Sequence, residues 1–128
     1  MLNFNSILLS TEDPEKLAAF YEKVFEKKPD MDEEKYKGFL VGSCFLGIGF
    51  HDKIHGKNPN PERILFNFET KDVKGEFERI KQIDGATVVA QPYEMKPAWI
   101  ATFADPDGNY FQLITPWEDM QKDMGNEK

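Results

Sequence analysis

The same order of predicted elements occurs twice along the chain, and this repetition constrains the fold more than any other feature. Residues 1–51 and residues 62–117 each read as a strand, a helix and three further strands. The two segments align when Asp13 is placed on Asp72, a shift of 59 residues that also superimposes the threonine two residues before each aspartate. Because one such half is too small to cover both faces of its own sheet, we expect the halves to share a core.

The first repeat is defined by its hydrophobic periodicity. Apolar residues at helical spacing predict a helix within residues 11–29, which Thr11 or Asp13 can cap and which Pro29 ends. Strands are predicted before and after this helix, over residues 2–10, near 32–37, and over 38–42 and 44–51. The first repeat therefore predicts the order βαβββ.

The second repeat follows the same order. A helix is predicted over residues 72–85, with Gly85 at its end. Strands are predicted over residues 63–71, 87–95, 97–105 and 109–117. The segment 52–61, rich in Pro, Asn and Gly, predicts the loop that joins the repeats, and the polar residues 118–128 predict a tail. We expect residues 1–128 to form a single domain of the α+β class.

Composition and charge exclude several classes of partner. The net charge of −7 argues against nucleic acid, whose binding is dominated by Lys and Arg, and against anionic membranes. No stretch approaches the roughly 20 apolar residues of a membrane span, and the first residues lack the basic start of a signal peptide. Cys44 is the only cysteine, so no disulfide can form within the chain. We therefore expect a cytoplasmic protein.

Two stretches resemble the vicinal oxygen chelate superfamily, which includes glyoxalase I, extradiol dioxygenases and the bleomycin and fosfomycin resistance proteins. The sequence SILLSTEDPEKLAAFYEKVF, residues 6–25, resembles the first strand and helix of that family. The sequence FADPDGNYFQLITP, residues 103–116, resembles its C-terminal signature. The resemblance implies two βαβββ modules whose mixed sheets curl around a cleft, as in glyoxalase and bleomycin resistance proteins, and it implies a homodimer.

Enzymes that resemble this chain hold a divalent metal with His and Glu side chains at four strand positions. The resemblance places those positions on Ser6, Gly47, Leu65 and Gln112. Divalent first-row metals prefer imidazole, thiolate or carboxylate ligands, and none of the four residues offers one. We therefore expect no metal and no other cofactor. The Gln112 amide can both donate and accept hydrogen bonds, which suits an uncharged polar group of a ligand, although a purely structural strand residue is equally compatible.

Other residues that could carry chemistry have simpler explanations. His51 and His55 flank a loop rich in Gly and Pro, so we expect solvated side chains rather than a pair of zinc ligands. Cys44 has no basic neighbour and is expected to be a small packed residue. Asp105 and Asp107 belong to a turn, where carboxylates more often accept hydrogen bonds from the turn backbone than serve as an acid and base pair.

Aromatic residues are the remaining candidates for a ligand site. In the resembled fold, the strand faces that bear the four metal positions line the cleft. This implies that Phe45, Tyr110 and either Trp99 or Phe39 form cleft walls, and that Gly47 and Gly49 leave room for a ligand. Clefts that are mainly apolar with a few polar anchors are typical of small-molecule sites. The alternative is that the aromatic side chains fill the cleft.

We expect a metal-free protein that binds or sequesters a small, partly apolar molecule, such as an antibiotic. The first alternative is a metal-dependent lyase or dioxygenase of the same superfamily with relocated ligands. The second is an interaction module with a filled cleft, in which no hydrophobic ligand would quench the fluorescence of Trp99. We favour a binding protein over an enzyme, because the four metal positions lack ligating side chains.

Overall fold

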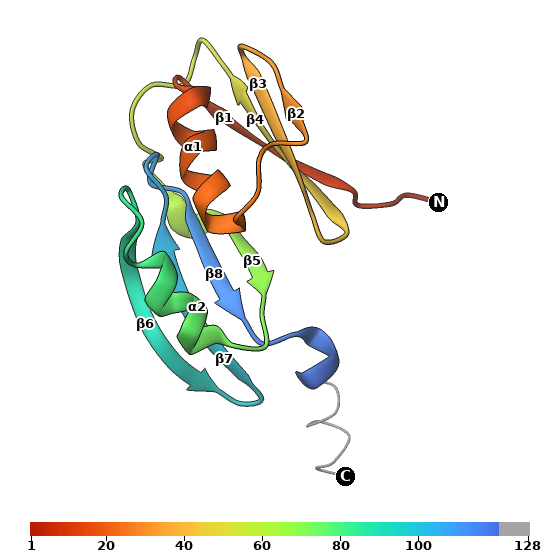
Figure 1. The fold of residues 1–128 in the computed structure, drawn as a ribbon, viewed down its shortest axis with the longest axis vertical. Coiled ribbons are helices and arrows are strands. Elements are labelled where there is room, and N and C mark those ends of the chain that lie inside the picture. The colour runs from red at the N-terminus through yellow and green to blue at the C-terminus, as the bar shows by residue number, and fades with distance from the viewer. Residues whose placement is uncertain (121–128) are drawn as a thin grey trace. The chain divides into compact units, whose positions relative to one another are not determined.

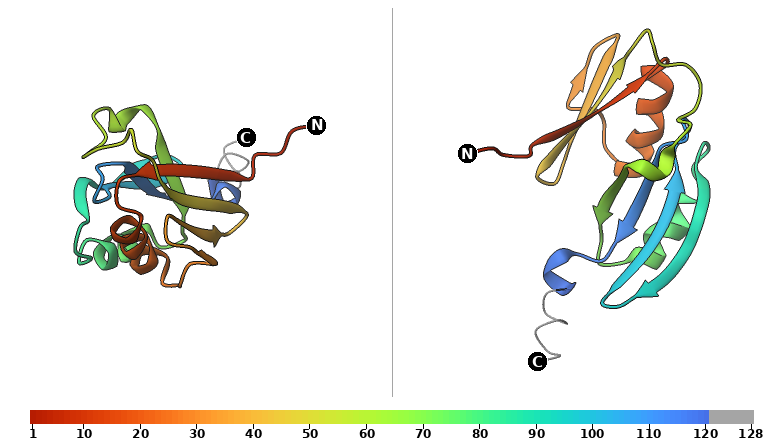
Figure 2. Two further views of the ribbon diagram at one scale, coloured as in Figure 1. Left: turned by 90° about the horizontal axis from the view of Figure 1, so that it is seen from above. Right: turned by 180° about the vertical axis from the view of Figure 1, so that it is seen from behind.

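The computed structural model describes residues 1–120, and the chain divides into two compact units, Met1–Lys57 and Asn58–Lys128. Within the described residues, each unit combines an α-helix with a four-stranded mixed sheet (Figures 1 and 2). This confirms the predicted α+β class with two βαβββ modules. The division between the units lies within the segment between the two repeats.

The first unit has a helix between its first two strands and a two-residue turn between its last two. Its elements are β1 (Ser6–Thr11), α1 (Pro14–Phe25), β2 (Met31–Asp32), β3 (Tyr36–Val41) and β4 (Cys44–Phe50). The strand order is β1-β4-β3-β2, with β1 parallel to β4 and the other pairs antiparallel. The first strand therefore lies beside the last.

The second unit repeats this topology. Its elements are η1 (Pro61–Arg63), β5 (Leu65–Glu69), α2 (Val73–Ile80), β6 (Thr87–Met95), β7 (Ala98–Ala104) and β8 (Tyr110–Ile114). The strand order is β5-β8-β7-β6, with β5 parallel to β8. A helical turn begins at Trp117, and the remainder of the predicted tail, residues 121–128, lies outside the described residues.

The repeat is visible in the way each helix begins. Asp13 caps α1 by accepting from the Lys16 N–H at 3.1 Å, and Asp72 caps α2 by accepting from the Gly75 N–H at 3.0 Å. The threonine two residues earlier accepts from the N–H of the capping aspartate at 3.1 Å in both units. Equivalent side chains therefore satisfy equivalent backbone donors, which identifies Asp13 as the cap of the first helix.

Several predicted boundaries were wrong. The first strand begins at Ser6, and residues 2–5 precede it. Helix α1 ends at Phe25 because Glu26 adopts a left-handed conformation with φ of 57°, so the helix ends before Pro29 is reached. Helix α2 ends at Ile80, and successive turns lead from there to Gly85.

The predicted strand near 32–37 was also wrong. Strand β2 contains two residues, whereas Tyr36 and Lys37 begin β3. The Lys37 ammonium group lies 2.6 Å from Asp32 and 3.0 Å from Glu15 on α1. This buried lysine side chain therefore faces the helix and pairs with carboxylates on both sides, as burial of a charge requires.

The core of each unit lies between its helix and one face of its sheet. In the first unit, the rings of Phe25 on α1 and Phe39 on β3 pack edge to face with centroids 5.3 Å apart. In the second unit, Phe77 on α2 stacks on Phe103 at 5.2 Å, which in turn stacks on Phe111 at 5.5 Å. Burial of a Phe side chain stabilises the folded state by roughly 1.5 to 3 kcal/mol. The face of each sheet that carries these rings is therefore the face that its helix covers.

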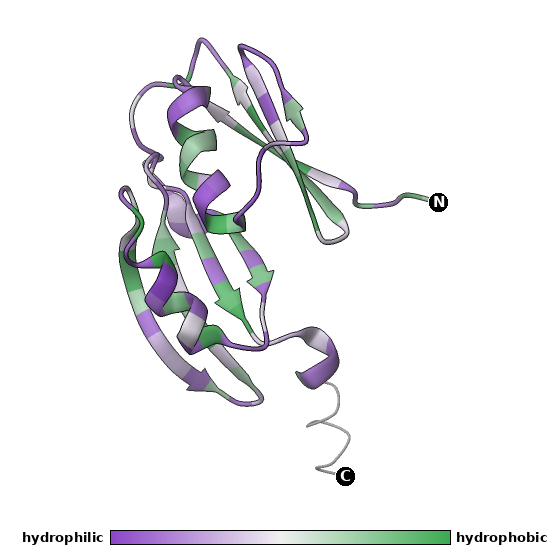
Figure 3. Cartoon of the chain, viewed as in Figure 1, coloured by the Kyte–Doolittle hydropathy of each residue, from purple (hydrophilic) through white to green (hydrophobic). Residues whose placement is uncertain are grey.

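The opposite face of each sheet, which we call its far face, carries the other half of the strand residues. Apolar and polar residues alternate over residues 66–69 of β5 and residues 110–113 of β8, as expected when the two faces of a sheet differ (Figure 3). Because Phe111 faces α2, its neighbours Tyr110 and Gln112 point to the far face of the second sheet. The same argument places Gly38, next to Phe39, on the far face of the first.

Candidate functional site

Three neutral polar side chains lie side by side across the far face of the second sheet. Asn67 on β5 is the register partner of Gln112 on β8, and Gln112 is the register partner of Thr102 on β7. The Gln112 Nε2 donates a hydrogen bond to Thr102 Oγ1 at 3.1 Å. We call Asn67, Gln112 and Thr102 the amide row.

The amide row has mainly apolar residues on both sides. Along the strands in one direction, the next residues are Leu65, Tyr110 and Ala104, which are register partners of one another. In the other direction, Ile114 pairs with Ile100. A few polar groups among apolar side chains are typical of sites for small organic molecules.

The charge near the amide row is low. Among the far-face residues of β5, β7 and β8, Glu69 is the one ionisable carboxylate, and it lies at the end of β5 beside Ile114. Its Oε2 accepts from the Trp117 N–H at 3.4 Å. The centre of this face therefore presents the amide groups of Asn67 and Gln112 rather than charges, with Thr102 buried beside them.

Six of the eight predicted site residues lie on far faces. In the first sheet, Ser6 is the register partner of Phe45, and Gly47 lies two residues further along β4. In the second sheet the three are Leu65, Tyr110 and Gln112, of which the first two are register partners. Within each unit, the structure brings the predicted residues together.

Phe39 and Trp99, by contrast, do not line a far face. Phe39 is fully buried against Phe25 of α1. The Lys74 ammonium group of α2 lies over the Trp99 ring, with Nζ 3.9 Å from the ring centroid. Both side chains point to the helix side of their sheets, so the prediction that one of them forms a cleft wall does not match their positions.

The space next to Gly47, which was predicted to leave room for a ligand, is also occupied. A Cβ atom on Gly47 would lie 2.5 Å from the Tyr36 hydroxyl and 3.1 Å from the Tyr36 ring carbon that bears it. A Cβ atom on Gly38 would collide with the tip of the Phe45 ring. The glycines of the first sheet therefore accommodate aromatic rings of the same sheet, which corrects the expectation that Gly47 leaves room for a ligand.

Three residues that belong to these faces, Asn67, Thr102 and Tyr36, were missed in the sequence. Asn67 lies two residues after Leu65, so strand alternation alone could have placed it on the same face. Thr102 and Tyr36 could be found only from the register of β7 with β8 and of β3 with β4. Register between strands distant in sequence is not encoded in the spacing of one strand.

The side chains at the four implied metal positions do not fit a metal ion. Ser6 donates to the neighbouring Asn5 side chain, and Gln112 donates to Thr102, while Gly47 and Leu65 have no ligating group. Within residues 1–120, no three His, Cys, Asp or Glu side chains come together in a way that could hold a metal ion. The side chains at these four positions therefore do not support metal-dependent chemistry.

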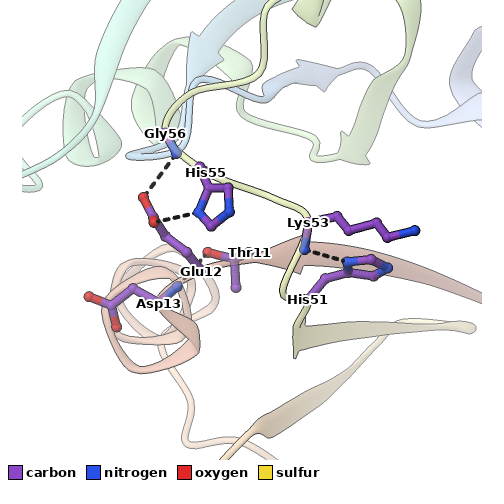
Figure 4. Close-up of polar contacts among 7 residues, drawn as sticks. All are labelled: Thr11, Glu12, Asp13, His51, Lys53, His55 and Gly56. Carbon is purple, nitrogen blue, oxygen red and sulfur yellow. Dashed lines mark hydrogen bonds and ion pairs between the residues drawn. The ribbon is translucent and has the colours of Figure 1, made fainter.

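The two histidines have separate partners (Figure 4). His51 Nδ1 accepts from the Lys53 N–H at 3.1 Å, whereas His55 Nδ1 lies 3.5 Å from Glu12 Oε2. The Gly56 N–H donates to Glu12 Oε1 at 2.9 Å, and this hydrogen bond, followed by that of His55, lowers the pKa of Glu12. The group formed by Glu12, His55 and Gly56 ties the loop after β4 to the start of α1.

The carboxylates of the turn before β8 have a structural role. Asp105 is buried and accepts from the Asp107 N–H at 2.9 Å, the Asn109 N–H at 2.9 Å and the Asn109 side-chain amide at 3.1 Å. Asn58 donates to the Asp107 carbonyl oxygen and to the Asn109 side chain. This turn therefore orders the chain that leads into β8 and Gln112, as predicted for Asp105.

Comparison with known proteins identifies one family. A family model described as a glyoxalase-like domain matches residues 6–114, which include all eleven elements from β1 to β8. Within the described part of the chain, residues 1–120, no helix has the length and apolar character needed to cross a membrane.

Several solved structures share the fold at low sequence identity. A glyoxalase/bleomycin resistance protein/dioxygenase family enzyme from Burkholderia phytofirmans PsJN is 22% identical, with a TM-score of 0.72, and the match covers 89% of this chain and 98% of that one. A glyoxalase-related enzyme from Fulvimarina pelagi is 16% identical, with a TM-score of 0.76 and coverage of 91% and 89%. A genomically encoded fosfomycin resistance protein from Listeria monocytogenes is 23% identical, with a TM-score of 0.70 and coverage of 94% and 98%.

Proposed function

This chain belongs to the glyoxalase-like domain family of the vicinal oxygen chelate superfamily, and from that premise we propose that it binds a small, partly apolar molecule without a metal. The observation that carries the proposal is the side-chain chemistry at the four implied metal positions. Ser6, Gly47, Leu65 and Gln112 provide neither a carboxylate nor an imidazole.

Among the four implied metal positions, the one occupied by Gln112 differs most informatively, because an amide stands there in place of a carboxylate. Gln112 follows the DPDGN turn, where the resemblance implies a metal-binding Glu. A neutral amide brings no negative charge to offset a dication, so metal binding loses its main electrostatic contribution there. The same amide can instead exchange a donor and an acceptor with an uncharged ligand.

The surroundings of Gln112 support binding of an organic molecule. Leu65, Tyr110, Ile100 and Ile114 place apolar groups on both sides of the amide row. We propose that these side chains supply affinity through burial of apolar surface, and that the amide row supplies orientation. One protein of the same fold is a fosfomycin resistance protein from Listeria monocytogenes, and we propose that this chain sequesters a comparably small compound.

A thermal-shift screen combined with elemental analysis tests this proposal. We expect purified protein to contain far less than one metal ion per chain and EDTA to leave the melting temperature unchanged. We expect some partly apolar compounds to raise the melting temperature, because a ligand present at 100 times its Kd stabilises the folded state by about 2.7 kcal/mol.

The alternative outcome would favour an enzyme. One tightly held metal ion per chain, removed by chelation and restored by added metal, would contradict the proposal and support a metal-dependent lyase or dioxygenase. If no compound raised the melting temperature, an interaction module would be favoured instead. Because Trp99 lies under Lys74 on the helix side of its sheet, its fluorescence is a poor reporter of far-face binding.

A further inference from the structure

We propose that the amide row selects ligands that carry a neutral carboxamide-type group, meaning a primary amide, a lactam or a urea, and rejects the matching carboxylates. This inference rests on the proposed function and names the class of ligand. It is carried by Asn67, Gln112 and Thr102, which are register partners on three adjacent strands.

The internal repeat shows that the fold does not require a polar row at this position. The shift of 59 residues places Leu8 of β1 on Asn67 of β5. Leu8 is the register partner of Gly47, and Gly47 is the register partner of Gly38. The same position of the first sheet is therefore occupied by one leucine and two glycines. A structural role shared by both sheets would not explain three hydrogen-bonding side chains in the second sheet alone.

The hydrogen bond within the row determines what remains available to a ligand. Because Gln112 Nε2 donates to Thr102 Oγ1, the orientation of the Gln112 amide is fixed, and its carbonyl oxygen remains an acceptor. Thr102 is itself buried, with 5% of its surface exposed, so its hydroxyl orients the Gln112 amide and is not counted among the groups offered to a ligand. The exposed Asn67 amide beside them adds two donors and one acceptor. The row therefore presents donors and acceptors together.

A carboxamide matches this arrangement, whereas a carboxylate does not. A carboxamide donates through nitrogen and accepts through oxygen, so it can pair with another carboxamide through two hydrogen bonds. A carboxylate only accepts, so the carbonyl oxygen of Gln112 would face a second acceptor without a hydrogen between them. Glu69, on the same face, adds repulsion of an anion. We expect at least tenfold weaker binding of a carboxylate, the usual effect of one polar group left unpaired.

The apolar side chains on both sides of the amide row favour a ligand with a flat hydrocarbon next to its carboxamide. We therefore choose three probes with one ring system: 2-naphthamide, 2-naphthoate and methyl 2-naphthyl ketone, which accepts hydrogen bonds but does not donate them. Binding to the full chain is followed in ¹⁵N–¹H correlation spectra, which report the side-chain NH₂ groups of Gln112 and Asn67 directly. We expect 2-naphthamide to shift both NH₂ signals and to bind at least tenfold more tightly than either other probe.

Two variants separate recognition from folding. Gln112→Met keeps the approximate length of the side chain and removes its hydrogen bonds, and we expect it to abolish the preference for 2-naphthamide over the ketone. Gln82→Met is the matched control, because Gln82 is exposed and follows α2. We expect the control to keep the preference in full. Dispersed backbone signals in both variants establish that each is folded.

The outcomes distinguish this inference from the proposed function. Equal affinities for 2-naphthamide and 2-naphthoate, or shifts confined to residues outside β5, β7 and β8, would overturn the inference while leaving small-molecule binding intact. If Gln112→Met does not fold, the comparison of the three probes on the unmodified chain still decides the question. Absence of binding by every probe and by every compound of the thermal-shift screen would overturn the proposed function itself.

Discussion

Two glycines of strand β4, Gly47 and Gly49, have very different surroundings. A Cβ atom on Gly47 would lie 2.5 Å from the Tyr36 hydroxyl, whereas a Cβ atom on Gly49 would meet its nearest neighbours, Leu8 and Tyr36, at an ordinary 3.4 Å. The same substitution at these two positions therefore tests whether the Tyr36 ring lies on the sheet as described.

We expect Gly47→Ala to destabilise the protein by about 1 to 3 kcal/mol, the usual cost of inserting an atom into a packed position. Gly49→Ala is the control and should change the free energy of unfolding much less. Tyr36→Phe removes the hydroxyl group and should recover part of the loss in the Gly47→Ala background. Urea denaturation gives the free energy of unfolding of the unmodified protein and of these three variants. Equal losses for Gly47→Ala and Gly49→Ala would contradict the described position of the Tyr36 ring.

A second prediction at the residue scale concerns Glu12. Its pKa lies below the ordinary value of 4.5, mainly because the Gly56 N–H donates to its carboxylate. A carboxylate whose pKa is lower in the folded state contributes stability that is fully present above about pH 4.5. That contribution is lost as the pH falls through the lowered pKa of Glu12.

NMR titration of the Glu12 side-chain carboxyl carbon should therefore give a midpoint below 4.5. The Gly56 amide signal should move with the same midpoint, because the two groups share a hydrogen bond. In Glu12→Gln the Gly56 signal should no longer follow that transition. A Glu12 midpoint at or above 4.5 would show that the loop is not tied to the start of α1.

At the scale of secondary-structure elements, the two helix caps are equivalent. Asp13→Ala and Asp72→Ala each remove a carboxylate that accepts from the first turn of a helix, and we expect each to cost about 1 kcal/mol. Asp84→Ala, at an exposed position after α2, is the control and should stay within about 0.5 kcal/mol of the unmodified protein. Denaturant midpoints check the three variants, and an effect at only one cap would contradict the equivalence.

The existence and order of the elements could be predicted because each depends on local signals. The spacing of apolar residues predicted both helices, and β6 was predicted with its observed bounds, Thr87–Met95. The ends of the helices depend on less local features. Helix α1 stops at a left-handed Glu26, a residue type that rarely adopts this conformation, so no glycine or proline marks the end.

At the scale of the whole molecule, we propose a homodimer. The first sheet presents exposed apolar side chains on its far face, with Leu8 62% and Leu40 53% exposed in the single chain. Exposed apolar side chains on one face of a sheet favour association, because burial removes them from water. Light scattering coupled to size exclusion should give twice the 14.8 kDa of one chain. A mass of one chain at every concentration would contradict the proposal, and Leu8→Ser with Leu40→Ser should shift a dimer toward monomer.

The sequence by itself determined the βαβββ repeat, the two capping aspartates as candidates, and the side chains present at the four implied metal positions. These depend only on residue identity and on spacing along the chain, which are local. The tertiary structure alone decided that Phe39 and Trp99 face the helices, that Tyr36 covers Gly47, and that Asn67 and Thr102 flank Gln112. Alternation along a strand divides its residues into two sets, but only the pairing of strands and the packing of a helix determine which set is covered.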